Sequence, residues 1–196
     1  MKRTSLFILL SWALGAAWGC AAKSGFLIIS EDQPPTTIEA SFETGIYRID
    51  GDDELTVLLY DGPAEQPSQA MVIRMLWSPR AARTPVDPDA TNATIRYVVF
   101  SGMEKGQIGI YEGAGYLYPV GRVGRGRLEF GLWQANLRWA DSGEDYVDHI
   151  GRARVTGRFT VRRDDHSMSQ VLRQLNVLIT RRLGYPRFAR SIVDSR

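Results

Sequence analysis

The sequence predicts a mainly β protein: a single antiparallel β-sandwich or barrel of about eight strands, followed by one C-terminal amphipathic helix. Short stretches rich in Ile, Val, Tyr and Phe recur between turn residues along residues 26–163. No helical pattern interrupts these stretches, which argues against a parallel sheet. Only residues 166–183 carry apolar side chains at helical spacing. Residues 38–196 are therefore expected to form one β-rich domain that ends in a helix.

The first strands are predicted from apolar runs and from alternation. Residues 20–37 are expected to form a tether and a short strand that ends before Pro34 and Pro35, because proline lacks a backbone donor. Apolar and polar residues then alternate, which predicts one strand whose shared face holds Ile38, Ala40, Phe42, Thr44 and Ile46. The run 55–60 is apolar on both faces and predicts a central strand, and strands are also expected at 70–77 and 94–101.

The second half of the chain predicts three longer strands. Gly113 and Gly115 interrupt the strand at 108–118 and indicate a bend or bulge. Between 128 and 139 the apolar phase changes after Leu132, which is what a β-bulge does to a strand. Residues 151–163 alternate most regularly, with an apolar face and a face rich in arginine.

The helix carries start and stop signals. Ser167 and Gln170 suit a capping box, and Asp164 and Asp165 supply negative charge where a helix N-terminus favours it. Gly184 follows the last apolar position and ends the helix at about residue 183.

The N-terminus has the pattern of a secretory signal peptide. Lys2 and Arg3 precede an apolar run at residues 6–18, which is shorter than the roughly 20 apolar residues that cross a bilayer. Removal of residues 1–19 leaves 177 of the 196 residues, with 22 basic and 22 acidic side chains. A zero net charge argues against a nucleic-acid binder. The charges are segregated, at −7 for residues 20–120 and +7 for residues 121–196.

The segment from Ala17 to Ala21 resembles a bacterial lipoprotein signal, in which a small residue precedes an acylated cysteine. Gly19 and Cys20 match that pattern, whereas Ala17 stands where the family usually has Leu. The resemblance implies acyl chains such as palmitate on Cys20, an anchor in a membrane of the cell envelope, and, from Ala21, the outer membrane where there is one. Ordinary cleavage after Gly19 or Ala22 is the alternative. Cys20 is the only cysteine, so neither a disulfide nor a cysteine-metal site is expected.

The arginine stripe is the main candidate binding surface. Arg152, Arg154, Arg158 and Arg162 share the outward face of one predicted strand. A row of guanidinium groups could bind phosphate, lipid headgroups or an anionic polymer, because each can fork onto an anion. The alternative is a solvated face whose arginines pair with acids on neighbouring strands, for instance Glu39, Glu43 or Glu129.

Other residue groups give little support for catalysis. His149 follows Asp148, and His166 follows Asp165, so an acid–base or metal site would need two separate loops to converge. The acidic residues at 50–54 favour a turn over a calcium loop. The sequence holds no nucleophile elbow, P-loop or dinucleotide fingerprint, so we expect no enzyme and no cofactor.

The order of about eight strands and then a helix resembles the lipocalin layout. That family's early Gly-x-Trp signature is missing, so the resemblance is one of element order. It implies a carrier whose cavity is lined by aromatic side chains, for which the candidates are Tyr111, Tyr116, Tyr118, Trp133 and Trp139. The leading hypothesis is a lipid-anchored, non-catalytic envelope protein that faces the periplasm or the exterior and contacts an envelope protein or an anionic polymer. A carrier of a small apolar ligand is the alternative.

Overall fold

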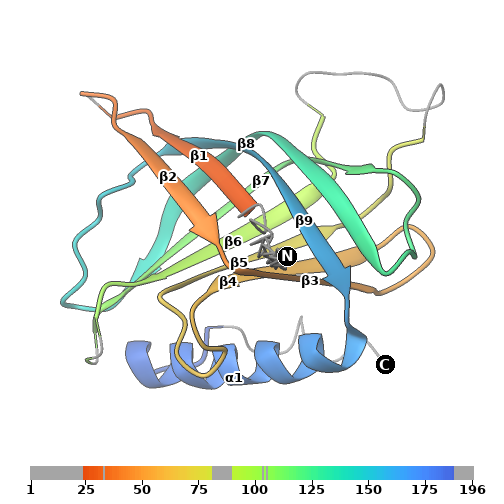
Figure 1. The fold of residues 1–196 in the computed structure, drawn as a ribbon. Helices are drawn as coiled ribbons and strands as arrows, with labels where there is room; N and C mark the ends of the chain where they lie inside the picture. The colour runs from red at the N-terminus through yellow and green to blue at the C-terminus, as the bar shows by residue number, and fades with distance from the viewer. Residues whose placement is uncertain (1–23, 33, 81–89, 103, 105, 188–196) are drawn as a thin grey trace, which may run out of the picture.

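The computed structural model describes residues 24–32, 34–80, 90–102, 104 and 106–187. The predicted signal peptide and Cys20 lie outside the described residues. The described chain forms a closed seven-stranded β-barrel with an extra two-stranded hairpin and one helix beneath it (Figure 1). The expectation of a mainly β fold with one C-terminal helix is confirmed, and the architecture is a barrel.

Nine strands precede the helix. Their bounds are β1 Ser24–Ser30, β2 Thr37–Phe42, β3 Thr44–Ile49, β4 Leu55–Asp61, β5 Gln69–Met75, β6 Ala93–Phe100, β7 Ile108–Val120, β8 Arg127–Ser142 and β9 Ala153–Arg163, and the helix is α1 Asp165–Leu183. Strands β3 to β8 follow one another around the barrel with antiparallel neighbours at every step. This order matches the hairpin-length connections of the sequence.

Strand β9 closes the barrel. One of its edges pairs with β8 in antiparallel register from Arg127↔Arg162 to Leu137↔Ala153. Its other edge pairs with β1 over residues 153–158 and then, in parallel, with β3 at Ile46↔Arg162. Strand β2 pairs with the free edge of β1. Strand β9 therefore pairs with three other strands, β1, β3 and β8.

The barrel interior is packed with side chains. The inward faces alternate as predicted along β9, where Val155, Phe159 and Val161 are buried. Phe159 stacks on Phe130, with ring centroids 5.7 Å apart, and also packs against Phe26 at 5.1 Å. Aromatic contacts of this kind add to the burial of apolar surface. The rings of Phe26, Phe130 and Phe159 thus fill the space between β1, β8 and β9.

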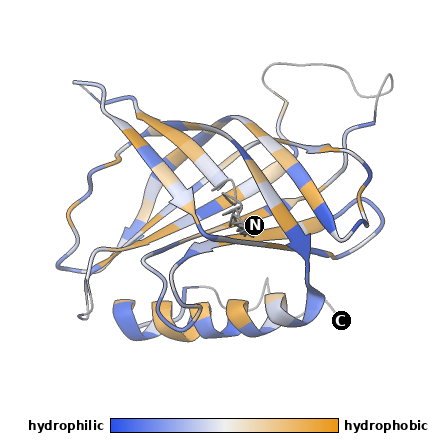
Figure 2. Cartoon of the chain, in the orientation of Figure 1, coloured by the Kyte–Doolittle hydropathy of each residue, from blue (hydrophilic) through white to orange (hydrophobic). Residues whose placement is uncertain are grey.

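Helix α1 covers the outer face of the sheet from β3 to β7. Its apolar stripe meets outward side chains of those strands, and the buried set is Ile46, Leu58, Ala70, Val72, Val98, Ile108, Ile110, Met168, Val171, Leu172, Leu175 and Ile179. Figure 2 shows hydrophobic residues recurring along α1 and along the strands above it. The apolar character of β4 on both faces follows from this, because Leu58 packs under α1 while Val57 and Leu59 face the interior.

Two local predictions need correction. The single strand expected from Ile38 to Ile46 is broken after Phe42, and Glu43 separates β2 from β3. Ile46 therefore lies under α1 instead of sharing the interior face with Ala40 and Phe42. The phase changes at Glu43 because one residue outside the pairing reverses the facing of all that follow.

The helix cap also differs from the expected capping box. Asp164 is the N-cap, and its carboxylate accepts a hydrogen bond from the Ser167 backbone N–H at 2.9 Å. This hydrogen bond lowers the pKa of Asp164. The predicted negative charge at the helix start and the stop at Gly184, which has φ 89°, are confirmed. A carboxylate is the stronger acceptor for the orphan N–H groups, which explains why Asp164 takes this place.

Both predicted irregularities occur, one where β7 pairs with β8 and the other where β8 pairs with β9. The register shifts between Ala114 and Tyr116 on β7 and between Leu132 and Ala135 on β8. Gln134 has a positive φ of 43°, and Trp133 remains 50% exposed. A Cβ at Gly113 would lie 1.6 Å from the Asn136 carbonyl oxygen, so only glycine permits this close approach.

Within the described part of the chain, α1 lacks the apolar length needed to cross a bilayer.

The contact between α1 and the sheet gives a first prediction. Leu175→Ala should lower the free energy of unfolding by about 2–5 kcal/mol, because Leu175 is only 2% exposed and its loss leaves a cavity. Val177→Ala is the matched control on the exposed side of α1 and should change stability by less than about 0.5 kcal/mol. Denaturant unfolding measures both, and equal effects would contradict the packing of α1 on the sheet.

Candidate functional site

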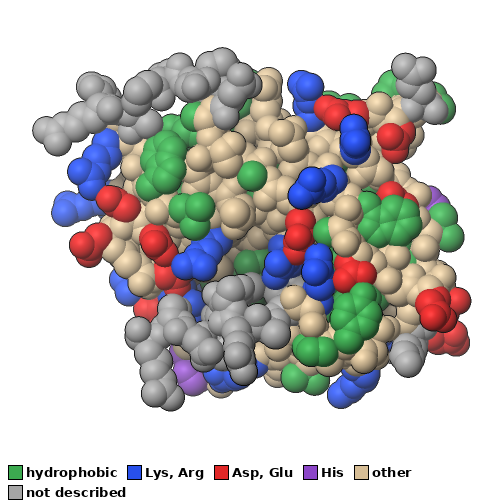
Figure 3. All heavy atoms as spheres, turned by 180° about the vertical axis from the view of Figure 1, so that it is seen from behind, with side chains coloured by type: hydrophobic (Ala, Val, Ile, Leu, Met, Phe, Trp, Pro, Cys, Tyr) green, Lys and Arg blue, Asp and Glu red, His purple; other side chains and the backbone are tan. Residues whose placement is uncertain are grey.

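A groove of about 740 Å³ crosses the outer face of the barrel beside α1. It lies on the rear face, where acidic and basic side chains intermix (Figure 3). Four short side chains on β4 to β7 contribute to its lining, namely Thr56, Val72, Thr94 and Ala114, and Thr94 and Ala114 are directly opposite each other. Short outward side chains leave space that longer ones would fill.

The walls of the groove are strongly charged. Five arginines line it, from five different strands or strand ends: Arg48, Arg74, Arg96, Arg138 and Arg152. Three acidic residues also line it: Glu31, Asp50 and Glu112. The positive excess in a partly enclosed site favours anionic ligands.

The end of the groove nearest α1 is a fixed network. Arg48 Nε donates to Asp50 Oδ1 at 2.7 Å, and Thr56 Oγ1 donates to Asp50 Oδ2 at 2.6 Å. Arg48 also donates through Nη1 to Ser169 Oγ on α1 at 3.2 Å. The Asp50 side chain is only 6% exposed. Because all these groups are satisfied, this network is a structural clamp between β3, β4 and α1.

A charge ladder crosses the middle of the groove. Arg96 on β6 stands opposite Glu112 on β7, and Glu112 stands opposite Arg138 on β8. The register between β8 and β9 ends at Leu137↔Ala153, and Arg138 and Arg152, which both line the groove, are the residues that follow on either side of this pair. Glu112 forms its short ion pair with Arg96, at 2.7 Å, and a longer one of 3.7 Å with Arg187.

Arg138 and Arg152 form the end of this ladder that is available to bind an anion. Among the residues that the structure describes, neither guanidinium has an ion pair or a side-chain hydrogen bond. Both side chains are exposed. Like charges directly opposite each other on adjacent strands are destabilising. Two unpaired guanidinium groups in this arrangement form a natural site for a carboxylate or a phosphate.

The predicted arginine stripe on β9 divides into paired and unpaired members. Arg154 Nε pairs with Glu31 at 2.7 Å, and Arg158 pairs loosely with Glu129 at 3.8 Å. Arg162 pairs with Asp164 at 3.1 Å. Of the four predicted residues, Arg152 lies in the groove and has no ion pair with any residue that the structure describes, and the other three have acidic neighbours.

The remaining candidate residues do not assemble into a reactive site. His149 precedes β9 and His166 follows it, so the structure separates the two histidines by the length of that strand. In the turn at 50–54, Asp53 pairs with Arg80 and Glu54 pairs with Arg74. Within the described ranges, no group of three His, Cys, Asp or Glu side chains could hold a metal ion.

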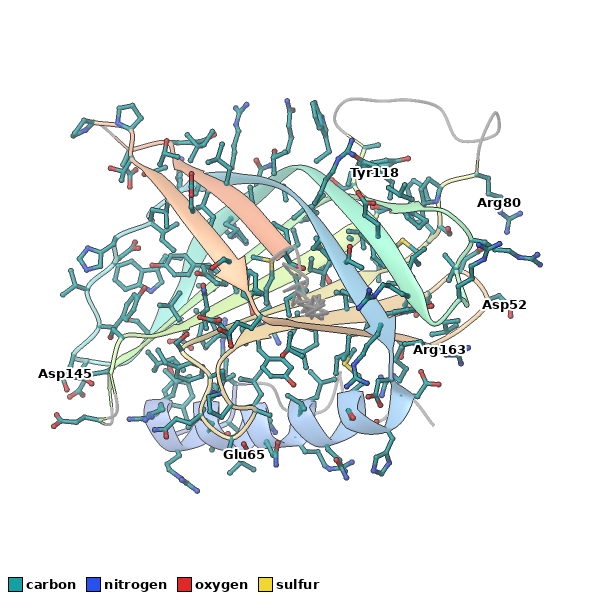
Figure 4. The ribbon with its side chains drawn as sticks, viewed as in Figure 1. Asp52, Glu65, Arg80, Tyr118, Asp145 and Arg163 are labelled. Carbon is teal, nitrogen blue, oxygen red and sulfur yellow. The ribbon has the colours of Figure 1, made fainter. Side chains whose placement is uncertain are left out.

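The aromatic candidates for a cavity lie in two places. Tyr111 is buried inside the barrel, whereas Tyr116, Tyr118 and Trp133 gather on the outside of β7 and β8, where Figure 4 labels Tyr118. Tyr116 also packs edge-on against Trp77, with centroids 6.2 Å apart. Trp139 is 46% exposed. The five aromatics therefore do not line one interior cavity.

Asp148, in the loop between β8 and β9, connects this loop to Tyr111 in the barrel interior. Its Oδ1 accepts hydrogen bonds from the Tyr111 hydroxyl at 2.5 Å and from the N–H groups of Ile150 and Gly151 at 2.9 Å each. Burial acts to raise the pKa of Asp148, but these hydrogen bonds and nearby His149 outweigh it and hold the pKa below its usual value. Burial, with help from Asp148, raises the pKa of Tyr111, which keeps its hydroxyl as a donor.

No protein-family model matches the chain, and no curated protein or solved structure matches it. The groove was missed at the level of the sequence because its arginines lie singly on separate strands. Arg96 and Arg138 each occupy an outward position of an alternating segment, which was the available signal. Their alignment depends on the register between strands, which alternation within one strand does not reveal.

Asp148 yields a second prediction. Asp148→Ala should lower the free energy of unfolding at neutral pH by about 2 kcal/mol, because three donors lose a charged acceptor. Since the folded pKa of Asp148 lies below its unfolded value, the wild-type advantage is present above about pH 4 and is lost as the pH falls through the folded pKa.

Denaturant unfolding of the two proteins at a series of pH values measures this difference. Asp145→Ala removes an equal charge from the same loop and is the control (Figure 4), since Asp145 is exposed. A difference between wild type and Asp148→Ala that persists unchanged at pH 2 would contradict the assignment.

Proposed function

We propose that this protein is a non-catalytic binding protein of the cell envelope, tethered through acylated Cys20, that binds an anionic polymer in its outer groove. The observation that carries the proposal is the ladder Arg96–Glu112–Arg138–Arg152, which leaves two adjacent guanidinium groups without partners among the described residues. The tether is supported by the signal-like segment that precedes Cys20.

The shape of the groove favours a polymer over a single small anion. Arg96 and Arg152 lie three strands apart, which at about 4.8 Å per strand is a path of roughly 14 Å around the barrel. One anionic group cannot contact both ends of such a path. A chain that carries repeated carboxylate or phosphate groups can contact Arg138 and Arg152 with one group and the neighbourhood of Arg96 with another.

A carrier of an apolar ligand is the second candidate, since a closed barrel followed by a helix is compatible with it. The packing of aromatic rings inside the barrel favours a ligand in the groove over a ligand in the interior. Phe26, Phe42, Phe130 and Phe159 contact one another or neighbouring rings inside the barrel. An apolar ligand would have to separate these rings, whereas a ligand in the groove requires no such movement.

The tether predicts a definite N-terminal mass. The N-terminal peptide of the protein isolated from the membrane fraction should begin at Cys20 and carry the added mass of two or three acyl chains, because stable anchoring takes more than one chain. Cys20→Ser should abolish this modification. A peptide that begins unmodified at Cys20 or at Lys23 would contradict the tether and leave the groove proposal standing.

The groove predicts binding of a linear polyphosphate or a linear polyuronate, which share repeated anionic groups. Arg138→Ala and Arg152→Ala should each weaken binding about tenfold, through loss of a charge-assisted hydrogen bond. Arg173→Ala, on the exposed side of α1, is the matched control and should bind like the wild type. Calorimetric titration with each of the two polymers distinguishes a phosphate ligand from a carboxylate ligand. Titration with neutral dextran tests whether binding depends on charge.

Two results of that titration would refute the groove. Wild-type affinity in both groove variants would show that Arg138 and Arg152 do not contact the ligand. Equal binding of dextran would show that recognition does not depend on charge.

A further inference from the structure

A second basic surface lies on the hairpin between β7 and β8. Arg122, Arg125 and Arg127 are exposed there, and no side-chain ion pair or hydrogen bond holds any of them within the described residues. The turn is shaped by Gly121 and Gly124, whose φ angles are 117° and 97°. The three arginines thus project from a tight, solvent-facing turn.

The hairpin is nevertheless held firmly on the barrel. The hydroxyl of Tyr47, which is fully buried, donates to the Arg125 carbonyl oxygen. The Arg163 N–H donates to the Gly126 carbonyl oxygen at 2.7 Å. Figure 4 labels Arg163 at the point where β9 passes into α1. Backbone contacts therefore fix the turn while its guanidinium groups remain free to bind.

The acidic residues of β8 and of the junction between β9 and α1 that lie near the hairpin are already paired. Glu129 lies 3.8 Å from Arg158, and Asp164 lies 3.1 Å from Arg162. Asp165 pairs with Arg163 at 3.0 Å. These pairs neutralise the arginines of β9 and leave the charges of the hairpin uncompensated. The hairpin segment 121–127 itself carries three positive charges and no acidic residue.

The described chain begins at the same end. Ser24, the first residue of β1, donates through its hydroxyl to the Thr160 carbonyl oxygen. Thr160 pairs with Glu129 on β8, two residues from Arg127. The N-terminus of β1 and the hairpin therefore lie on either side of the last third of β9.

The length of chain before β1 limits how far this end can be from a membrane. Only four residue steps separate Cys20 from Ser24, and at 3.3–3.6 Å per step they span at most about 14 Å. If Cys20 carries acyl chains, as proposed above, Ser24 stays within that distance of the lipid surface. A positive surface beside such an attachment point would meet the headgroups of the bilayer.

We infer that the surface formed by Arg122, Arg125 and Arg127 binds anionic lipid headgroups of the membrane in which Cys20 is anchored. This inference rests on the proposed tether for its geometry, and the charged surface itself can be tested without acylation. This surface is distinct from the groove. Arg127 of the hairpin pairs with Arg162, and Arg162 is ten residues, or roughly 33 Å of extended strand, from Arg152 of the groove. The arginines of the groove then lie away from the lipid surface, where a ligand in the surrounding solution can reach them.

The test is co-sedimentation of the chain from Cys20 onward, with Cys20→Ser, on lipid vesicles. This chain contains every residue that forms the described barrel and helix. It should bind vesicles of phosphatidylcholine with 30% phosphatidylglycerol and not pure phosphatidylcholine. Replacement of Arg122, Arg125 and Arg127 by Ser should weaken this binding by about thirtyfold or more, since each arginine contributes to attraction by an anionic surface.

A variant with the same change in net charge is the control. Arg154→Ser, Arg173→Ser and Arg181→Ser together should leave vesicle binding within about twofold of the wild type, because these residues line neither the groove nor the hairpin. Thermal unfolding of both triple variants checks that they fold. The hairpin variant should bind soluble polyphosphate like the wild type.

Three results would overturn the inference. The first is equal binding to both kinds of vesicle. The second is an equal loss in the two triple variants, which would indicate an unspecific charge effect. The third is binding of polyphosphate, but not of vesicles, through the hairpin arginines. None of these depends on the N-terminal mass, so failure of the lipid surface and failure of the tether are separate results.

Discussion

The pairing of β9 on both of its edges is the constraint on which the rest of the structure depends. Its long antiparallel ladder with β8 and its shorter pairings with β1 and β3 close the barrel. Because β9 leads through Asp164 directly into α1, its direction also decides which outer face the helix covers. The part of the outer face that α1 leaves open contains the groove. Barrel closure, helix placement and the candidate site thus share one cause.

The sequence allowed most elements to be predicted, and it failed where a single residue changes the facing of a strand. The alternation along β9 and the helical spacing of Met168, Leu175 and Ile179 are local patterns, and both correspond to what the structure contains. Glu43 is different. Nothing in its neighbourhood distinguishes a continuous alternating strand from two strands, and the pairing of β3 with β4 and β9 places Ile46 outside.

The candidate site was less accessible to prediction, for a physical reason. A stripe on one strand can be recognised from period-two spacing, which is why Arg152 was found. A ladder across strands needs the register, and in a barrel the strands are also offset along their axes. The acidic first half and the basic second half of the chain form ion pairs with each other, such as Glu31 with Arg154 and Glu112 with Arg187. Arg138 and Arg152 remain outside this balance.

Closure by the last strand has a consequence for how the chain acquires its structure. Ser24 and Thr160 are 136 positions apart, so the edge of β1 that pairs with β9 stays unpaired until almost the whole chain is available. Such non-local pairing slows folding, because loop-closure entropy must be lost before the contacts compensate for it. A nascent chain would stay open, with unpaired strand edges, throughout its synthesis. Until β9 is available, the unpaired edges of β1, β3 and β8 are exposed to association with other chains.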